Sequence, residues 1–410
     1  MRVAVLGGGL QGACVALELA VHGIQVDLFE RDDRCFGRAS AHNEGKIHLG
    51  YVYANDPTRQ TARLMARGAV CFQALMRRWI CDAIDRVPVS DPFFYAVHRE
   101  SLLTIEQVEE HFGDTQRILL EESNGHGIEY FGSDYREAPA RLSDDECARH
   151  FDPRAVQAAY RTAEIAIDSE ALGSAVRERL SDERRICSHL QSEVCAVTPT
   201  EGSVAVAYET RGHRFARQYD HVVNTLWDGR LAIDLTAGVP APRPWLLRTK
   251  HFLRMRAPRN GSSLPTTTIL LGPFGDIVSY TNDETFLSWY PAGMTEISSA
   301  LESARRSPEL KGEAAGQMRE NILAGLAGII PAAGRIPAES IDSCRVKAGV
   351  IFAWGTTDIT DLASGLHERF AVGPVSHGRY HTVDTGKLTL APYFGKMVAD
   401  RILGRASDEE

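Results

Sequence analysis

Three glycines near the start of the chain constrain the fold more than any other feature. Gly7, Gly9 and Gly12 have the spacing G-x-G-x-x-G within VAVLGGGLQGACVALELAV. Residues 3–6 before them form an apolar run typical of a buried parallel strand, and residues 13–21 after them have the small and apolar residues of a packed helix. Glycines between a strand and a helix allow a tight turn and a close approach of the backbone to a pyrophosphate. The pattern therefore predicts a dinucleotide-binding α/β fold.

An acidic residue follows at the end of the next predicted strand. Gly23 is expected to end the helix, residues 24–29 alternate as a strand does, and Glu30 comes directly after them. A carboxylate there accepts hydrogen bonds from ribose hydroxyls and repels a 2′-phosphate, so the pattern favours FAD or NAD over NADP. The competing interpretation is a glycine turn in another α/β fold, although strand, glycines, helix, strand and acid all occur here in order.

Composition argues against several classes of protein. The formal net charge of −9 over 410 residues disfavours a nucleic-acid partner, because such partners are met by basic surfaces. The sequence has no apolar run of about 18 residues, so we expect no membrane span. The eight cysteines have no C-x-x-C pair and no spacing typical of metal ligands. We therefore expect reduced thiols, no metal site and a cytoplasmic protein.

Two further segments favour FAD over NAD. Residues 39–53, ASAHNEGKIHLGYVY, place Ser40, Asn43 and other polar side chains in a loop punctuated by glycine. Residues 372–399 contain TGKLTLAPYFGKMVA, in which residues 385–386 are predicted to begin a helix. A helix N-terminus suits the negative charge that a reduced flavin develops. Two loops that close on one extended dinucleotide indicate an FAD site.

Together these motifs resemble the FAD-dependent oxidoreductases of the D-amino-acid oxidase (DAO) family. GGGLQG followed by Glu30 is similar to the family's first flavin motif, and TGKLTLAP is similar to the turn that members place over the pyrimidine edge of the flavin. SAHNEGKIHLGYVY looks most like the L-2-hydroxyglutarate oxidase and glycerol-3-phosphate dehydrogenase branches, which also carry I-H-x-G. One departure is VVNTLWDGR, where Trp227 stands in what is usually a turn of small residues and glycine.

The resemblance implies an α/β fold built from two interleaved domains. One is a Rossmann-like FAD-binding domain of the glutathione-reductase type, and the other is an α+β substrate domain with a mixed or antiparallel sheet. The FAD-binding domain is expected over residues 1–80, 161–240 and 341–410, and the substrate domain over residues 81–160 and 241–340. Residues 193–224 alternate between turn signals, which predicts an antiparallel meander.

Matching positions imply a set of FAD-binding residues. They come from the glycine turn, the acid and arginine after the second strand, the following loop, a strand beside the adenine and the closing turn. The set is Gly7, Gly9, Leu10, Gln11, Gly12, Glu30, Arg31, Ser40, Asn43, Gly45, Val194, Gly386, Lys387, Leu388 and Thr389.

Catalysis is predicted to depend on two residues of the second loop, His48 and Lys46. Enzymes of this type remove a hydride from a carbon that bears an amine or a hydroxyl, and the protein supplies a base. A neutral imidazole at His48 suits that role, while a structural hydrogen bond or a covalent link to the flavin are alternatives for the same residue. Lys46 and Lys387 are expected either to stabilise charge on the flavin or oxygen, or to form ordinary salt bridges.

Substrate contacts are predicted for Tyr53, Arg254, Tyr290, Arg379 and His381. Arg254 belongs to RTKHFLRMR at residues 248–256, where alternation places Arg248, Lys250, Phe252, Arg254 and Arg256 on one face. Such a face binds a carboxylate or phosphate, or it is simply exposed to solvent, which is the more common case.

The leading hypothesis is an FAD-dependent oxidase or dehydrogenase that acts on a small, polar and anionic molecule, with a 2-hydroxy acid favoured. Its electron acceptor is expected to be O2 or a quinone. An amine or amino-acid oxidase of the same family is the closest alternative. A non-redox flavin- or NAD-binding protein that uses the fold as a scaffold is the third.

Overall fold

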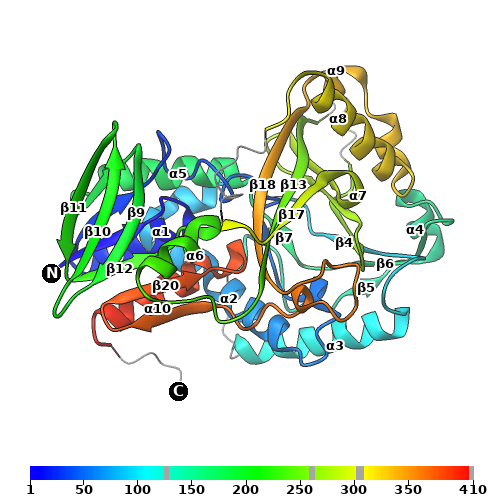
Figure 1. The fold of residues 1–410 in the computed structure, drawn as a ribbon. Helices are drawn as coiled ribbons and strands as arrows, with labels where there is room; N and C mark the ends of the chain where they lie inside the picture. Colours follow the sequence, from blue (N-terminus) through cyan, green and yellow to red (C-terminus); the bar gives the residue numbers. More distant parts are fainter. Residues whose placement is uncertain (124–128, 258–263, 302–308, 406–410) are drawn as a thin grey trace.

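Two large sheets dominate the computed structural model, and the chain crosses between them several times (Figure 1). The structure describes residues 1–123, 129–257, 264–301 and 309–405. Among the helices of these residues, none is both long enough and apolar enough to cross a membrane.

The first sheet has six strands in the order β19-β20-β12-β1-β2-β8. Neighbouring strands run parallel, except that β19 is antiparallel to β20. The strands are β1 (Arg2–Leu6), β2 (Gln25–Phe29), β8 (Ile186–His189), β12 (His221–Asn224), β19 (Gly373–His377) and β20 (Tyr380–Asp384). The predicted Rossmann-like arrangement is thus confirmed, with the glycine turn directly after its central strand β1.

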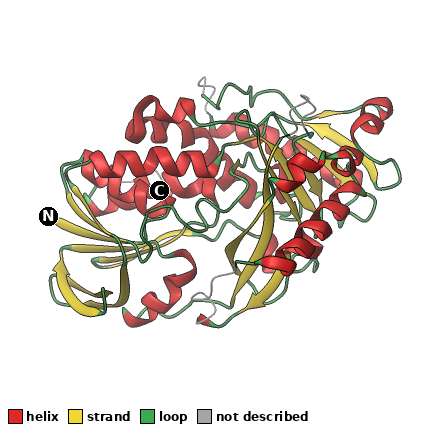
Figure 2. Ribbon diagram, turned by 90° about the horizontal axis from the view of Figure 1, so that it is seen from above, coloured by secondary structure: helices red, strands yellow, loops and turns green. Residues whose placement is uncertain are grey.

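Residues of β1 pack alternately on two different layers, because successive side chains of a strand point to opposite faces. Val3 and Val5 pack in a core with helices, whereas Ala4 and Leu6 pack in a core with a three-stranded sheet. Figure 2 shows the helices gathered on one side of this region and the small sheet on the other. The helices are α1 (Leu10–Val21), α5 (Ser169–Asp182) and α10 (Ala391–Ile402), with α2 (Gln60–Ile80) packed on α1 and α10.

The three-stranded sheet is the antiparallel meander that the sequence predicts. It consists of β9 (Ser192–Pro199), β10 (Val204–Thr210) and β11 (His213–Tyr219). Val197, Val204 and Val206 are its fully buried apolar residues that face the parallel sheet.

The second large sheet has the order β17-β13-β16-β15-β14-β4-β6-β5, and β18 also pairs with β13. Every pair is antiparallel except β14 with β4, so the sheet is mixed, as expected. Its strands are β4 (Phe94–His98), β5 (Ala140–Arg141), β6 (Val156–Arg161), β13 (Trp245–Arg256), β14 (Thr267–Leu270), β15 (Gly275–Ser279), β16 (Glu284–Trp289), β17 (Met294–Ser298) and β18 (Arg345–Trp354).

Helices cover this sheet and connect it to the first. α8 (Gly312–Ala327) packs against β13 and β16, and α3 (Ile105–Glu122) packs on α2. A short pair of strands, β3 (Lys46–Ile47) and β7 (Ile165–Ala166), lies at the junction of the sheets. The remaining helices are α4 (Asp144–His150), α6 (Arg230–Thr236), α7 (Tyr290–Gly293) and α9 (Ala338–Asp342).

Strand β18 differs from the predicted division of the chain. Residues 341–410 are expected in the FAD-binding domain, yet residues 345–354 pair along β13 of the large sheet from Arg254↔Arg345 to Trp245↔Trp354. The long strand β13 has room for this partner because its other edge pairs with β16 and β17. The division into two domains otherwise stays a prediction.

The basic face of β13 is also buried rather than exposed. Arg248, Lys250 and Arg254 have relative exposures of 2%, 6% and 3%. Partner strands on both edges of β13 and packing on its faces remove these side chains from solvent. The more common interpretation of this pattern, a solvated face, is therefore wrong for these three residues, whereas Arg256 at the end of β13 is exposed.

Candidate active site

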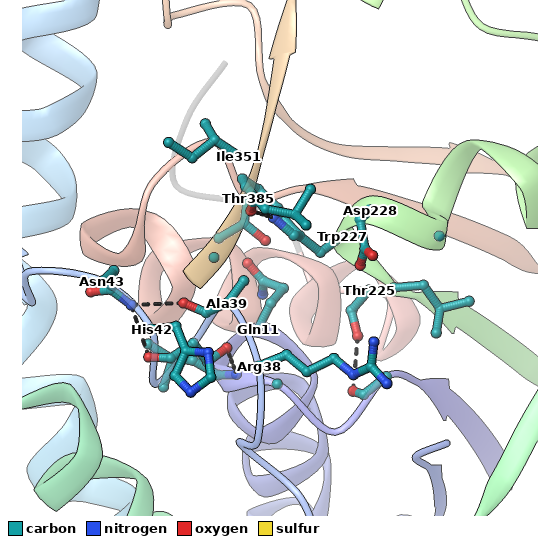
Figure 3. A pocket seen from close by; sticks show the side chains of 18 of the residues that line it. Gln11, Arg38, Ala39, His42, Asn43, Thr225, Trp227, Asp228, Ile351 and Thr385 are labelled. Carbon is teal, nitrogen blue, oxygen red and sulfur yellow. Dashed lines mark hydrogen bonds between the residues drawn. The ribbon is translucent and has the colours of Figure 1, made fainter. Parts of the chain in front are cut away.

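A cavity of about 430 Å³ runs from the glycine turn to the large sheet. Gly7 and Gly9 line one end, residues 385–388 line its side, and Lys250 and Tyr290 line the other end. Figure 3 shows Gln11, Asn43, Trp227 and other lining side chains around this space, contributed by segments far apart in the sequence. Predicted FAD-binding positions from both ends of the chain therefore meet at one cavity.

The glycine turn is shaped for a group that approaches the backbone. Gly7 has φ +101°, and a Cβ added at Gly9 would come within 2.9 Å of the Ser40 hydroxyl. The N-cap residue of α1, Gly9, has no side chain to cap the helix, and the first turn has no acidic residue. The N-terminus of α1 therefore offers N–H groups and partial positive charge to an anion such as a pyrophosphate. Ser40 lies at the same place, where its Oγ accepts from Leu10 N at 2.9 Å.

Glu30 lies beside this turn and lines the cavity. Its carboxylate accepts from Gly8 N at 2.9 Å and from Asp32 N at 3.0 Å. Burial raises the pKa of Glu30, and these backbone hydrogen bonds oppose the rise. Arg31, which is 3.3 Å from Asp228, and Val194 line the same end of the cavity.

Gly12 and Gly45, two other predicted FAD-binding positions, shape the backbone instead of lining the cavity. A Cβ at Gly12 would lie 1.9 Å from the carbonyl oxygen of Gly7. A Cβ at Gly45, where φ is +68°, would lie 1.8 Å from the carbonyl oxygen of Ile167. Asn43 fixes the loop by accepting from Gly45 N at 2.7 Å.

The closing turn begins its helix later than predicted. A 3₁₀ turn covers Leu388–Leu390 and leads into α10 at Ala391, rather than starting at residues 385–386. Gly386, Lys387 and Leu388 line the cavity. Thr389 does not line it but connects the closing turn to β3, since its Oγ1 accepts from His48 N at 2.9 Å and donates to Lys46 O at 3.2 Å.

Two buried lysines share one buried carboxylate at the large sheet. Lys46 Nζ lies 3.2 Å from Asp276 Oδ1, and Lys250 Nζ lies 3.8 Å from Asp276 Oδ2. Lys46 also donates to Thr268 Oγ1. Burial alone would raise the pKa of Asp276, but Lys46 and Lys250 hold it below its ordinary value. Likewise, burial would lower the pKa of Lys250, but Tyr290 and nearby carboxylates hold it above its ordinary value.

Lys387 adds a third ammonium group to the cavity. Burial, assisted by the positive charges of Arg369, Lys250 and Lys46, lowers the pKa of Lys387 to about 8, and Glu44 opposes this shift. The cavity therefore contains a lysine whose pKa, about 8, is well below the ordinary value for a lysine.

His48 also lines the cavity, with a relative exposure of 3%. Its ring lies 5.3 Å from that of Tyr53, measured between centroids. Burial and the charges of Lys387 and Lys46 lower the pKa of His48 well below its ordinary value, so the imidazole is neutral. A neutral imidazole can accept a proton, as a general base must.

The predicted substrate residues fall into two groups. Tyr290 lines the cavity, and Tyr53 is buried against His48. Arg254, Arg379 and His381 lie outside the lining. The Arg254 guanidinium is 2.8 Å from Asp168, Arg379 donates to Asp220 O at 3.2 Å, and His381 hydrogen-bonds Ser376 at 2.8 Å.

The direction of β20 explains the positions of Arg379 and His381. The cavity lies at the carboxyl end of this strand, where Thr385 follows Asp384, whereas these two residues lie at its amino end. Arg379 and His381 are close to the closing turn in the sequence, but they lie at the end of β20 that is away from the cavity.

Trp227, the departure from the family pattern, is accommodated in the cavity wall. Its φ is +52°, and its indole N–H donates to Val350 O at 2.7 Å. The turn after β12 is thus bound to β18 of the large sheet.

Sequence reasoning missed Asp276 and Glu164, and it considered Lys250 only as part of a basic face. Glu164 is fully buried at the end of the junction and contacts His48. A single acid within the apolar run of AEIAI at residues 163–167 was the available signal. Acids in such runs are seldom buried without a partner.

One group of described residues has the ligand types of a metal site. Atoms of Asp27, Cys187 and His189 lie within 4.8 Å of one another. The Asp27 carboxylate, however, is 2.8 Å from Arg2 and 3.7 Å from Arg217. These two arginines account for the buried charge, and the expectation of no metal site stays a prediction.

A parallel sheet with a glycine turn, an open helix N-terminus and a cavity that reaches a second sheet define a dinucleotide-dependent oxidoreductase. The chain belongs to the DAO family, because the family model described as FAD dependent oxidoreductase matches residues 2–401. The predicted family, the enzyme class and the FAD cofactor are thus confirmed.

Solved structures agree with this fold at low sequence identity. Glycine oxidase from Geobacillus kaustophilus has a TM-score of 0.69 at 16% identity, covering 100% of this chain and 96% of that one. L-proline dehydrogenase from P. horikoshii has a TM-score of 0.67 at 15% identity, covering 99% and 94%. L-alpha-glycerophosphate oxidase from Mycoplasma pneumoniae, solved with FAD bound, has a TM-score of 0.64 at 15% identity, covering 99% and 95%.

A curated relative matches over a short segment only. An FAD-dependent monooxygenase of Fusarium mangiferae is 38% identical over 50 residues, which are 12% of this chain and 14% of that protein. The chain thus matches only a small part of that relative's length.

Proposed function

We propose that the protein oxidises a small anionic alcohol, with a 2-hydroxy acid favoured, by removing a hydride from the carbon that bears the hydroxyl. The observation that carries this proposal is the charge of the cavity. Lys46, Lys250 and Lys387 line it together with one acid that acts on the last two, Glu44. The buried carboxylate of Asp276 lies between the first two lysines, so ammonium groups outnumber carboxylates in this part of the cavity.

The charge of the cavity supports an anionic substrate. Buried charges are costly unless they are paired, so a carboxylate that enters beside these ammonium groups would be stabilised. The same groups repel the ammonium of an amino acid, which favours a hydroxyl over an amine as the oxidised group. The I-H-x-G segment at residues 47–50 also supports the hydroxyglutarate and glycerophosphate branches.

Amine oxidation is the second candidate. Structures similar to this chain include a glycine oxidase and an L-alpha-glycerophosphate oxidase, so this fold accommodates both kinds of oxidation. At such low identity these names show the fold and not the substrate.

The residues present fit FAD. The glycine turn and the N-terminus of α1 would hold the pyrophosphate, Glu30 would accept the ribose hydroxyls, and residues 386–388 would lie beside the flavin ring. FAD supplies the acceptor for the hydride, and O2 or a quinone would then accept the electrons. The protein's own task is to bind the carboxylate through its lysines and to move the hydroxyl proton to His48.

The substrate class is tested by anaerobic bleaching of the FAD-loaded enzyme. Pairs that differ only in the reacting group, such as malate with aspartate and lactate with alanine, separate the two candidates. We expect the hydroxy acid of a pair to reduce the flavin faster. Reduction by the amino acid alone would overturn the assignment to alcohols, and reduction by neither member of any pair would overturn both candidates.

Replacing the base gives a second test. The substitution His48→Gln should slow flavin reduction by about 10²–10⁴-fold, the usual contribution of a positioned base, and leave the FAD absorbance unchanged. His98→Gln is the matched control, because His98 lies outside the cavity lining on β4. Reduction at the normal rate in His48→Gln would remove this residue from the mechanism.

A further inference from the structure

We propose that Glu164 is a positioning residue for His48: it keeps the proton of the imidazole on Nδ1, so that Nε2 faces the cavity ready to accept a proton. The inference rests on the proposed role of His48 as the base. It assigns a function to a buried acid that the mechanism above does not use.

Strand pairing places the two residues opposite each other. In the antiparallel pair β3–β7, Lys46 pairs with Ala166 and Ile47 pairs with Ile165. The next position along this register brings His48 beside Glu164. Their contact therefore follows from the backbone of the junction, and it does not depend on a flexible side chain reaching across a gap.

The carboxylate of Glu164 is held in place by two donors. Leu49 N donates to Oε2 at 2.6 Å, and the Tyr95 hydroxyl donates to Oε1. The residue has a relative exposure of 0%. Both oxygens of this carboxylate accept hydrogen bonds and no solvent surrounds it, so its orientation is fixed. A residue that positions another side chain needs such a fixed orientation.

His48 has an unused nitrogen on this side. Its Nδ1 lies 3.7 Å from Glu164 Oε1 and is buried with no hydrogen-bond partner among the described residues. A small rotation of the ring would close this distance to a hydrogen bond. Catalytic hydrogen bonds are often long before substrate binds and shorten afterwards. Because the two ring nitrogens lie on different edges of the imidazole, an Nδ1–H directed at Glu164 leaves the Nε2 lone pair for the cavity.

The charges around His48 show why such a partner is needed. Lys46 and Lys387 both lower the pKa of His48. Two further neighbours are neutral: Tyr53 lies beside His48, and Tyr95 lies beside Glu164. When His48 accepts the hydroxyl proton it becomes a cation near two ammonium groups. Glu164 is the acid in contact with it and provides the opposite charge.

The pKa of Glu164 is raised overall, because burial outweighs the influences that oppose it. Burial raises the pKa of Glu164, whereas Lys46 and the hydrogen bonds from Tyr95 and Leu49 oppose the rise. The proton that His48 takes from the substrate hydroxyl stays on Nε2. Once the ring has rotated to close the 3.7 Å gap, Glu164 accepts from Nδ1–H while the proton is transferred, as the acid does in a serine protease triad.

The test uses Glu164→Gln in the FAD-loaded enzyme labelled with ¹⁵N-histidine. Glutamine has the same shape but no charge and only one acceptor oxygen. That oxygen can still accept from Leu49 N, while the amide NH2 takes the place of Oε1, donates to the Tyr95 hydroxyl and offers no acceptor to His48. NMR of the labelled rings, with His48→Gln to assign the signal, reports which nitrogen carries the proton. We expect an Nδ1–H imidazole in the native enzyme and loss of this preference in Glu164→Gln. This readout does not depend on turnover.

Kinetics supply the second readout. In Glu164→Gln, anaerobic flavin reduction should slow by about tenfold or more. This is part of the 10²–10⁴-fold rate enhancement that a positioned base contributes. The acid limb of its pH profile should move to lower pH, because loss of the carboxylate lowers the pKa of His48. Glu164→Asp should restore part of the rate and the pH profile.

Tyr95→Phe is the matched control. It removes a hydrogen bond to the same carboxylate but keeps the charge, so the Nδ1–H form and the pH profile should persist. The proposal is overturned if Glu164→Gln keeps the native tautomer, or if both variants change rate and profile equally, which indicates a structural role. If no tested substrate reduces the flavin, the proposed function fails, while the tautomer measurement still decides the role of Glu164.

Discussion

At the scale of single residues, the site is distinguished by lysines that the fold removes from water. Lys46 and Lys250 are 3% and 6% exposed, and Lys387, which is half-buried, has its pKa lowered to about 8 mainly by desolvation. Below that pH the cavity has an additional positive charge, and above it the charge is lost. Ligands that bear a negative charge should sense this change directly.

We therefore predict that anion binding weakens as the pH rises through about 8. The dissociation constant of acetate, measured from the flavin spectrum, should rise by about tenfold, or about 1.4 kcal/mol, between pH 7 and pH 10. Bound acetate raises the pKa of Lys387, so the change begins near 8 and extends above it.

Two controls define this result. Acetamide has the same shape without the charge, and its affinity should not change over this range. Lys387→Met should bind acetate weakly at every pH. A pH dependence that persists in Lys387→Met would assign the titration to another group.

At the scale of elements, a buried carboxylate connects α6 to the parallel sheet. Asp234 of α6 is 2% exposed. It accepts from Tyr380 at 2.6 Å, from Asn224 at 2.9 Å and from Thr382 at 3.0 Å, and it lies 3.2 Å from Arg230. The helix and the turn before it line the cavity near Trp227, so this network sets the position of part of the cavity wall.

The substitution Asp234→Ala should lower the free energy of unfolding by about 3–5 kcal/mol, because it breaks a buried ion pair and removes the acceptor of three buried hydrogen bonds, leaving Arg230 with its 3.5 Å contact to Asp384. Urea denaturation measures this cost, and the affinity for FAD should fall as well. Arg117→Ala is the control, since its ion pair with Asp114 is largely exposed, and exposed pairs contribute about 0–1 kcal/mol. Equal costs for the two substitutions would contradict the assigned importance of the buried network.

At the scale of the whole molecule, the cavity is bounded by both large sheets. The glycine turn of the parallel sheet lines one end, and Lys250 of β13 lines the other. A ligand that fills the length of the cavity therefore contacts two parts of the protein, which are also connected by crossing segments, by the pairing of β3 with β7 and by the hydrogen bond from Trp227 to Val350 O.

FAD should therefore stabilise the protein more than a ligand that occupies only the nucleotide end of the cavity. At a concentration of about 100 times its dissociation constant, a ligand adds about 2.7 kcal/mol to stability. At equal micromolar concentrations, thermal unfolding should show a larger rise in Tm with FAD than with ADP, which lacks the flavin. The same rise with both ligands would show that the flavin end adds no binding energy.

The sequence by itself determined the cofactor and the type of fold. The glycine turn, Glu30 and the closing turn act within short segments, where the spacing of residues fixes the backbone that a dinucleotide needs. Alternation also predicted the meander of β9–β11, because the period of side chains in a strand is local. These features could be predicted because each of them depends on residues that are close together in the sequence.

Only the tertiary structure decided the chemistry of the cavity. Lys46, Asp276 and Lys250 come from three separate strands, and Glu164 meets His48 through the pairing of β7 with β3. The same folding buried the basic face of β13 and left Arg254 bound to Asp168, away from the cavity. Burial and charge pairing depend on which distant segments pack together, and no local pattern in the sequence contains that information.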